Sequence, residues 1–274
     1  MIGKSVRSIA GFPVRNSRSQ VVIRYIRRRQ RQGRQTAVLF ANANAIIRCA
    51  HLRDKIREAQ DILLLNDGIG MDVASCLLYG RPFGENLNGT DFTPRLLSCL
   101  AAGTRVFLFG ARPCSVEGAA HMLPAKTGCH VIDFVDGYST VGQDERLTAR
   151  INEAQTEVLL VGLGNPLQEE WILRNRTHLN APIVMGIGAL FDFLSGQVPR
   201  APERWRRLRL EWLYRLGREP RRLGRRYTLD MVRFLLSLRR SPIQAVPPIP
   251  AAHTEDVTAI PRPDPDSMRS TGRL

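Results

Sequence analysis

A carboxylate at the end of a predicted buried strand is the first residue of this sequence that could do chemistry. Asp67 closely follows the apolar run 61–65 and opens a turn that contains Gly68 and Gly70. A carboxylate on such a turn can take a proton from a hydroxyl group as that hydroxyl attacks. Asp67 could equally cap the helix that the pattern predicts from residue 70. The two glycines are a weak nucleotide-binding signal, because the third glycine of a dinucleotide fingerprint is missing.

Amide side chains follow two other predicted strands. Asn42 and Asn44 come just after the apolar run 37–41. An asparagine at this place either forms the turn or hydrogen-bonds a sugar or an acceptor. Gln168 and Glu169 open a predicted helix after a glycine–proline turn. The first turn of a helix can bind phosphate, and Gln168 could read a base or a ribose; alternatively, Glu169 only stabilises the helix dipole.

The sequence gives no convincing metal motif. The five histidines show no ligand spacing, and the five cysteines include no CxxC pair, which favours reduced, apolar cysteines. Asp264 and Asp266 match the D-x-D that holds a divalent ion in many sugar transferases, but they lie in a proline-rich tail. We therefore predict no metal site and no other cofactor.

Alternating strands and helices must position these side chains. The strands are predicted at 37–41, 61–65, 105–109, 130–134, 157–162 and 182–186, and the helices at 44–60, 70–79, 92–102, 115–122, 143–155 and 167–178. This alternation predicts βαβ units and an α/β fold with a mostly parallel sheet. Ligands of such sheets bind beyond the carboxyl ends of the strands, so we expect the site there.

Positive charge is concentrated in two segments. Residues 1–35 contain ten Lys/Arg and no acidic residue, and residues 198–240 contain fourteen Arg and four acidic residues. Each segment has a net charge of +10, which leaves −5 for the rest of the chain. Such segments attract nucleic acid or an anionic membrane surface. No apolar stretch approaches the roughly 18–20 residues that span a bilayer, and no secretory signal is seen.

Composition predicts three parts of the chain. Residues 1–197 form the α/β core. Residues 198–240 interleave arginines with aromatic side chains, which predicts a basic amphipathic helical appendage that associates with a membrane surface. Residues 241–274 are rich in proline, which is typical of a disordered tail.

Six segments, in order, resemble the signature blocks of one family. They are LLNDGIGMDVASCLLYG with NLNGTDFTPRLL, VFLFGARP, GYSTVG, VGLGNPLQEEWI, GIGALFDFLSGQVPRAPERW and LEWLYRLGREPRRLGRRY. They resemble the WecG/TagA/CpsF glycosyltransferases, and the resemblance as a whole covers roughly residues 8–236. The resemblance implies an inverting transferase with a Rossmann-like core and a UDP-sugar donor. It also implies an acceptor saccharide linked to undecaprenyl diphosphate, as in teichoic acid, enterobacterial common antigen, capsule and exopolysaccharide assembly.

The resemblance also implies roles for individual residues. Asp67 falls on the proposed catalytic base, Asn42 on an active-site asparagine and Gln168 on a donor-binding glutamine. Three arginines fall on a C-terminal appendage that closes over the active site at the membrane: Arg215, Arg222 and Arg225.

Three positions depart from the family pattern. Phe40 stands where the family often has threonine, Asn44 where it often has histidine or glutamate, and Asn86 where an arginine is common. We expect these differences to concern the sugar or the acceptor. Glucose and N-acetylmannosamine or its uronic acid are the sugars that the resemblance indicates. The Phe-Ala-Asn-Ala sequence from Phe40 resembles the branch of exopolysaccharide glucosyltransferases more closely, and this resemblance favours glucose.

Two alternatives from other classes stay open. The sequence pI of about 10.8 is compatible with a basic nucleic-acid-binding protein, but no known nucleic-acid-binding motif accompanies the charge, so we expect no nucleic-acid partner. A catalytically inactive subunit of polysaccharide assembly is the other alternative, which the presence of Asp67, Asn42 and Gln168 disfavours. We expect a peripheral protein on the inner face of the cell membrane, for which an oligomer is possible.

Overall fold

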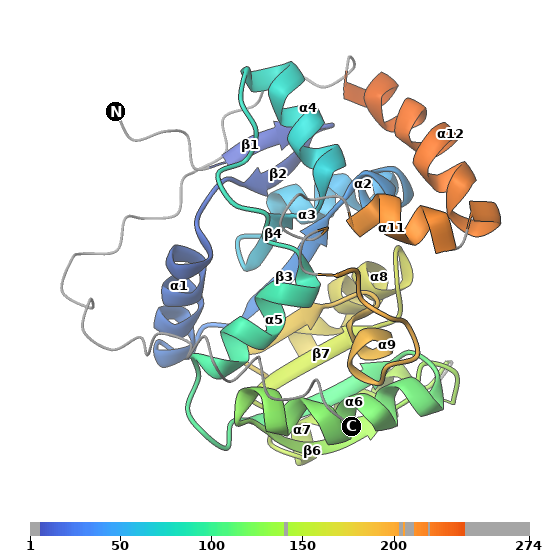
Figure 1. The fold of residues 1–274 in the computed structure, drawn as a ribbon. Coiled ribbons are helices and arrows are strands. Elements are labelled where there is room, and N and C mark those ends of the chain that lie inside the picture. The colour runs from blue at the N-terminus through green and yellow to red at the C-terminus, as the bar shows by residue number, and fades with distance from the viewer. Residues whose placement is uncertain (1–5, 140–141, 203–204, 206–210, 219, 239–274) are drawn as a thin grey trace.

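An eight-stranded sheet forms the centre of the molecule (Figure 1). The computed structural model describes residues 6–139, 142–202, 205, 211–218 and 220–238. The strands lie in the order β1-β2-β4-β3-β8-β7-β5-β6, and β1 is antiparallel to β2 while the other pairs are parallel. Their bounds are β1 (Val6–Ile9), β2 (Phe12–Arg15), β3 (Thr36–Ala41), β4 (Ile62–Asn66), β5 (Arg105–Gly110), β6 (His130–Val135), β7 (Val158–Gly162) and β8 (Ile183–Gly186). The predicted α/β fold with a mostly parallel sheet is confirmed.

Helices cover both faces of the sheet (Figure 1). One face carries α1 (Ser19–Arg31), α5 (Gly89–Ser98), α6 (Pro113–Thr127) and α9 (Leu190–Leu194). The other carries α2 (Ala43–Arg48), α3 (Arg53–Glu58), α4 (Ile69–Tyr79), α7 (Asp144–Glu153), α8 (Leu167–Asn175) and α12 (Pro220–Leu238). Two short 3-10 helices, η1 (Ala50–Leu52) and η2 (Arg176–His178), and helix α11 (Glu211–Arg218) complete the described elements.

Strand β3 shows why the central runs are apolar throughout. Ala37 and Leu39 pack into the hydrophobic cluster on the α2 side, and Val38 and Phe40 pack into the cluster on the α1 side. Successive side chains of a strand point to opposite faces, so a strand covered on both faces needs an apolar residue at every position.

Two regions differ from the predicted elements. The predicted helix 44–60 is divided into α2, η1 and α3, because the chain leaves α-helical geometry at Cys49. Residues 6–31, for which the sequence predicts only positive charge, form β1, β2 and α1. Helix α1 buries the apolar stripe Val22, Ile23 and Ile26, and its arginines lie outside this stripe.

Helix α12 packs on the face formed by α2 and α4. Phe234 and Leu238 are buried in the cluster on that face. Gly70 of α4 lets α12 approach closely, since a Cβ at this position would lie 3.1 Å from the Met231 Cε atom. Within the described residues, no helix combines the length and the apolar character that crossing a membrane requires.

The strand order reverses at the centre of the sheet. From β3 the chain continues to β4 on one side, whereas β5 to β8 lie on the other side, with β8 next to β3. The carboxyl ends of strands at such a switch point border a crevice, which is where open α/β sheets bind ligands.

Candidate active site

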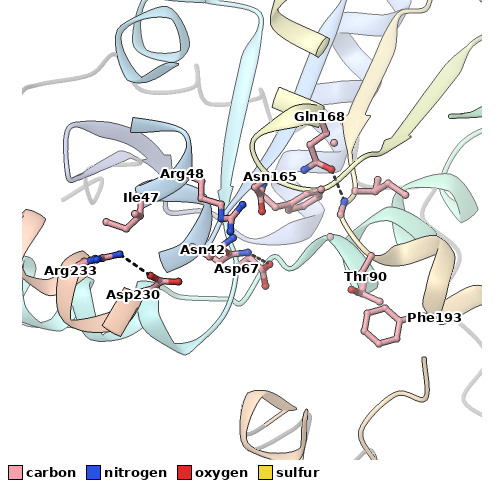
Figure 2. A pocket seen from close by; sticks show the side chains of 18 residues that line it. Asn42, Ile47, Arg48, Asp67, Thr90, Asn165, Gln168, Phe193, Asp230 and Arg233 are labelled. Carbon is pink, nitrogen blue, oxygen red and sulfur yellow. Dashed lines mark hydrogen bonds and ion pairs between the residues drawn. The ribbon is translucent and has the colours of Figure 1, made fainter. Parts of the chain in front are cut away.

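A cavity of about 710 Å³ opens at this switch point (Figure 2). Its walls come from the segments that follow β3, β4, β7 and β8, together with α5, α9 and α12. The lining residues are Phe40, Asn42, Asn44, Ile47, Arg48, Asp67, Gly89, Thr90, Gly164, Asn165, Gln168, Gly186, Ile187, Gly188, Ala189, Phe193, Asp230 and Arg233. The cavity therefore brings together Asn42, Asp67 and Gln168, although Gln168 follows the other two by more than a hundred positions in the sequence.

Asp67 lies in the turn after β4 and its side chain is half-buried. Its backbone N–H donates to the Ala41 carbonyl at 2.8 Å, which ties this turn to the end of β3. Gly68, with φ of 85°, is the N-cap residue of α4, and its N–H donates to Asn86 Oδ1 at 2.9 Å. Gly68, and not Asp67, is therefore the N-cap residue of this helix.

Asn42 links the first turn of α2 to Asp67. Its Oδ1 accepts from the Ala45 backbone N–H at 2.9 Å, so Asn42 is the N-cap of α2. This bond fixes the orientation of the Asn42 amide, so that its Nδ2 group donates to Asp67 Oδ2 at 3.2 Å. Asn42 is thus both a helix cap and a donor to the candidate base, and Figure 2 shows the two side chains together at the cavity.

Gln168 borders the cavity but uses both ends of its amide within the protein. Its side chain is buried, its Oε1 accepts from the Gly188 backbone N–H at 2.9 Å, and its Nε2 donates to Glu169 Oε1 at 2.7 Å. A Cβ on Gly186 would lie 3.2 Å from Gln168 Nε2, which is a tight contact. A larger residue at this strand end would therefore push against the Gln168 side chain. Gln168 therefore holds the loop after β8.

Glu169 lies behind this wall and contacts Cys49. Burial raises the pKa of Glu169, against the lowering effect of its hydrogen bonds from Gln168 and Asn165. Burial, and next the neighbouring Glu169 carboxylate, raise the pKa of the Cys49 thiol. Cys49 therefore stays an uncharged thiol. None of the five cysteines, all of which the structure describes, forms a disulfide.

Three charged side chains of the cavity were not predicted from the sequence. Arg48 comes from the end of α2, and Asp230 and Arg233 come from α12. Arg233 Nη1 lies 3.7 Å from Asp230 Oδ1. Arg48 and Arg233 are the cations among the described lining residues. Helical spacing could have indicated Arg48, since it lies four residues beyond Asn44 on α2. No pattern marks residues 230 and 233 as neighbours of Asp67.

The three arginines that the resemblance implies lie on α12, which lines this cavity, and on α11, which packs against α12. Arg215 is on α11, and Arg222 and Arg225 are on α12. Their side chains fall outside the part of the chain that the structure describes, so their role stays a prediction.

The three positions that depart from the family pattern have different places. Phe40 and Asn44 line the cavity. The Phe40 ring packs edge-on against Phe92, at a centroid distance of 6.1 Å, and lies against Gly89. Asn86 is outside the cavity wall, where it accepts from Gly68 N–H and so orders the turn that carries Asp67.

Within the described ranges, no group of three or more His, Cys, Asp or Glu residues is arranged to hold a metal ion. Asp264 and Asp266 lie outside those ranges.

The cavity thus combines a held carboxylate, amide side chains and arginines at the switch point of a parallel sheet. Comparison with known protein families agrees with this picture. Residues 7–246 match the model of the glycosyl transferase WecG/TagA/CpsF family, which is most of the 274-residue chain. The chain therefore belongs to the WecG/TagA/CpsF family and is a glycosyltransferase of cell-surface polysaccharide synthesis.

Proposed function

We propose that this enzyme transfers a sugar, with inversion, from a UDP-sugar to a saccharide linked to undecaprenyl diphosphate. The family supports a nucleotide-sugar donor and a lipid-linked acceptor. We further propose exopolysaccharide synthesis as the pathway and glucose as the sugar, with N-acetylmannosamine or its uronic acid as the alternative. The observation that carries the proposal is the Asp67 carboxylate, which reaches the cavity and accepts from Asn42 instead of capping α4.

The proposed step needs a base for the acceptor hydroxyl. Asp67 takes the proton while the hydroxyl oxygen attacks the anomeric carbon from the face opposite to the UDP group. The bond between that carbon and the diphosphate oxygen breaks, and its electron pair leaves with UDP. The donated hydrogen bond from Asn42 holds the Oδ2 atom and so orients the carboxylate at the cavity.

The departing diphosphate needs positive charge. We assign this charge to arginines, because guanidinium groups bind phosphate oxygens in a bidentate manner. Arg48 and Arg233 line the described cavity. Arg215, Arg222 and Arg225 belong to the same proposal, which is supported by α12, since Asp230 and Arg233 of this helix line the cavity and α11 packs against it.

We also propose that α4, α11 and α12 form the surface that meets the membrane. More than half of the exposed large apolar side chains among the described residues lie on these helices or at Trp205 just before them. They are Val73, Leu77, Trp205, Leu213, Leu229, Val232 and Leu236. The net charge of +10 in residues 198–240 adds about 1 kcal/mol of attraction for each basic residue near an anionic surface. A peripheral position on the inner face of the cell membrane follows from this proposal.

A donor screen tests the reaction. The purified protein is incubated with a synthetic prenyl-diphosphate saccharide and, separately, with UDP-glucose, UDP-N-acetylglucosamine, UDP-N-acetylmannosamine and its uronic acid, and mass spectrometry detects the product. We expect a mass increase of one hexose with UDP-glucose. Transfer from another UDP-sugar would correct the sugar, and transfer from none of them would contradict the proposal.

A vesicle assay tests the membrane surface. We expect the protein to co-sediment with vesicles that contain anionic phospholipid, and the paired change Val232→Glu and Leu236→Glu to release it. Met122→Glu on α6 is the matched control, because Met122 is also exposed but lies on the opposite face of the sheet. Release by both variants to the same extent would contradict the assignment of this surface. Retention on heparin without binding to vesicles would favour the nucleic-acid alternative.

A further inference from the structure

A buried carboxylate behind the cavity wall takes no part in the reaction step proposed above. Glu169 is only 3% exposed and does not line the cavity. Its Oε1 atom accepts two hydrogen bonds, from Asn165 Nδ2 at 2.5 Å and from Gln168 Nε2 at 2.7 Å. Glu169 Oε1 therefore accepts from the side-chain amides of both Asn165 and Gln168, which line the cavity.

These two bonds fix the orientation of both amides. An ionised carboxylate oxygen only accepts hydrogen bonds. If Glu169 is protonated, the proton resides on Oε2, because Oε1 is already occupied by two N–H donors. In both states the two NH₂ groups turn toward Glu169, and the two amide oxygens turn away from it.

The two amide oxygens then have different surroundings. Gln168 Oε1 accepts from the Gly188 N–H at 2.9 Å, so its capacity is used by the protein. Asn165 Oδ1 has no hydrogen-bond partner among the residues that the structure describes, although Asn165 is half-buried in the cavity wall. Figure 2 shows Asn165 among the side chains that line the cavity, as are Arg48 and Asn42. An oriented acceptor without a protein partner is thus available to a ligand.

Burial of Glu169 argues against a purely local role in α8. An acid in the first turn stabilises a helix dipole while exposed, as Glu170 does in the same turn of α8. Burying a carboxylate costs free energy, and the raised pKa of Glu169 reflects this cost. The protein keeps the carboxylate inside nevertheless, where its partners are the amides of Asn165 and Gln168 and the Cys49 thiol.

We infer that Asn165 determines donor specificity, with its Oδ1 accepting a hydrogen bond from an N–H or O–H group of the nucleotide-sugar donor. Glu169 is the positioning residue that holds Asn165 in this orientation. The inference rests on the proposed function, since it names the part of the same cavity that reads the UDP-sugar.

Calorimetric titration with UDP tests the inference apart from transfer activity. We expect Asn165→Ala to bind UDP about 5- to 10-fold more weakly than the wild-type protein, the effect of one lost hydrogen bond. Asn152→Ala is the matched control, because Asn152 lies on α7, donates to the His178 backbone carbonyl and does not line the cavity. Equal UDP and UDP-sugar affinity in the wild-type and Asn165→Ala proteins would overturn the inference. Failure of the wild-type protein to bind UDP would instead overturn the proposed donor.

Two changes at Glu169 separate hydrogen-bond positioning from charge. Glu169→Gln keeps an acceptor oxygen at the Oε1 place, so we expect UDP affinity within about twofold of wild type. Glu169→Leu removes the acceptor, so we expect a loss at least as large as that of Asn165→Ala. A merely structural role would lower the thermal stability of Glu169→Leu without changing UDP affinity, and that result would overturn the positioning role.

Three ligands distinguish the group that Asn165 reads. A loss for Asn165→Ala with UDP that disappears with 3-methyluridine diphosphate assigns the uracil N–H. A loss that persists with 3-methyluridine diphosphate assigns a ribose hydroxyl, and a loss seen only with UDP-glucose assigns a sugar hydroxyl. Each of these results supports the inference and names the contact.

Discussion

The two sides of the cavity differ in how they use their polar side chains. On the side of β3 and β4, Asp67 is half-buried and reaches the cavity, with Asn42 donating to it. On the side of β7 and β8, Gln168 and Glu169 are almost fully buried, and their polar atoms mainly hold the Asn165 amide and the Gly188 backbone. The first side presents a reactive group, whereas the second shapes a wall. Substitutions on the first side should therefore lower kcat, and those on the second should raise the donor KM.

Asp67→Asn should give the largest effect. The amide cannot take the acceptor proton, so we expect kcat to fall by about 100-fold or more while UDP affinity stays near that of wild type. Steady-state kinetics and calorimetry measure the two quantities. Asp54→Asn, at an exposed position of α3, is the control. Near-normal kcat in Asp67→Asn would remove this residue from the chemistry.

Removing three arginines tests whether α11 and α12 complete the first side. We expect the triple change of Arg215, Arg222 and Arg225 to Ala to lower transfer by about 10- to 100-fold even with a short soluble acceptor, because the leaving diphosphate loses its counter-charge. A soluble acceptor removes any contribution from membrane binding.

The control for the triple change removes the same charge elsewhere. Arg27, Arg28 and Arg31 lie in the last turns of α1, which leads to the amino end of β3, away from the cavity. Their change to Ala should leave transfer to the soluble acceptor unchanged. Equal losses in the two triple variants would mean that overall charge, and not position, matters.

Asn42→Ser should show the positioning role of Asn42. Serine can still cap α2, but it has no amide group to donate to Asp67, so we expect kcat to fall by about 10-fold with little change in melting temperature. Asn42→Ala should lose the cap as well, and so lower both kcat and stability without unfolding the protein. A fall in stability that accounts for the whole loss of activity would contradict the contact with Asp67.

Gln168→Ala should act on the other side of the cavity. Its loss frees the Gly188 N–H and the loop after β8, so we expect the donor KM to rise by about 5- to 10-fold with kcat within about twofold of wild type. Donor saturation curves measure both constants. A collapse of kcat at unchanged KM would place Gln168 in the chemistry and erase the contrast between the two sides.

Glu169→Gln should give the smallest effect, and it should depend on pH. The raised pKa means that folded Glu169 keeps its proton to a higher pH than the unfolded chain, whose Glu pKa is about 4.3. The stability that this proton contributes is present below about pH 4.3 and is lost as the pH rises through the folded value. Glutamine does not titrate, so Glu169→Gln should gain melting temperature over wild type at pH 8 and not at pH 4. We expect about 2–4 °C, which corresponds to about 1 kcal/mol for a chain of this size. An equal difference at both pH values would contradict the titration of Glu169.

The central sheet could be predicted because its signal is local. Every predicted strand matches a strand of the sheet, since apolar runs bounded by glycine are visible in the sequence itself. The β1–β2 hairpin was missed because its strands are four residues each, and β2 contains Pro13. The many arginines of α1 also obscure its buried apolar stripe in the sequence pattern.

The site could be predicted only in part. Asp67 and Asn42 stand at strand ends, which is where an α/β sheet binds ligands, so their meeting could be expected. Nothing in the sequence shows that Glu169 turns inward while Glu170 faces His51, because both occupy the first turn of α8. Asp230 and Arg233 reach the cavity because α12 packs against residues that are distant in the sequence, as Met231 does against Gly70. No local sequence pattern indicates such a contact.

The packing of α12 also sets the order in which the enzyme can become complete during synthesis. The strands of the sheet are all present once residue 186 has been made, but Phe234 and Leu238 fill the core, and Asp230 and Arg233 line the cavity, some fifty residues later. When β8 has left the ribosome and α12 has not, the nascent chain already contains the candidate base Asp67. The apolar face that α12 later covers, on the side of α2 and α4, is then still exposed. The cavity gains its last wall only when α12 emerges, so the finished site and the finished core are products of the same late folding event.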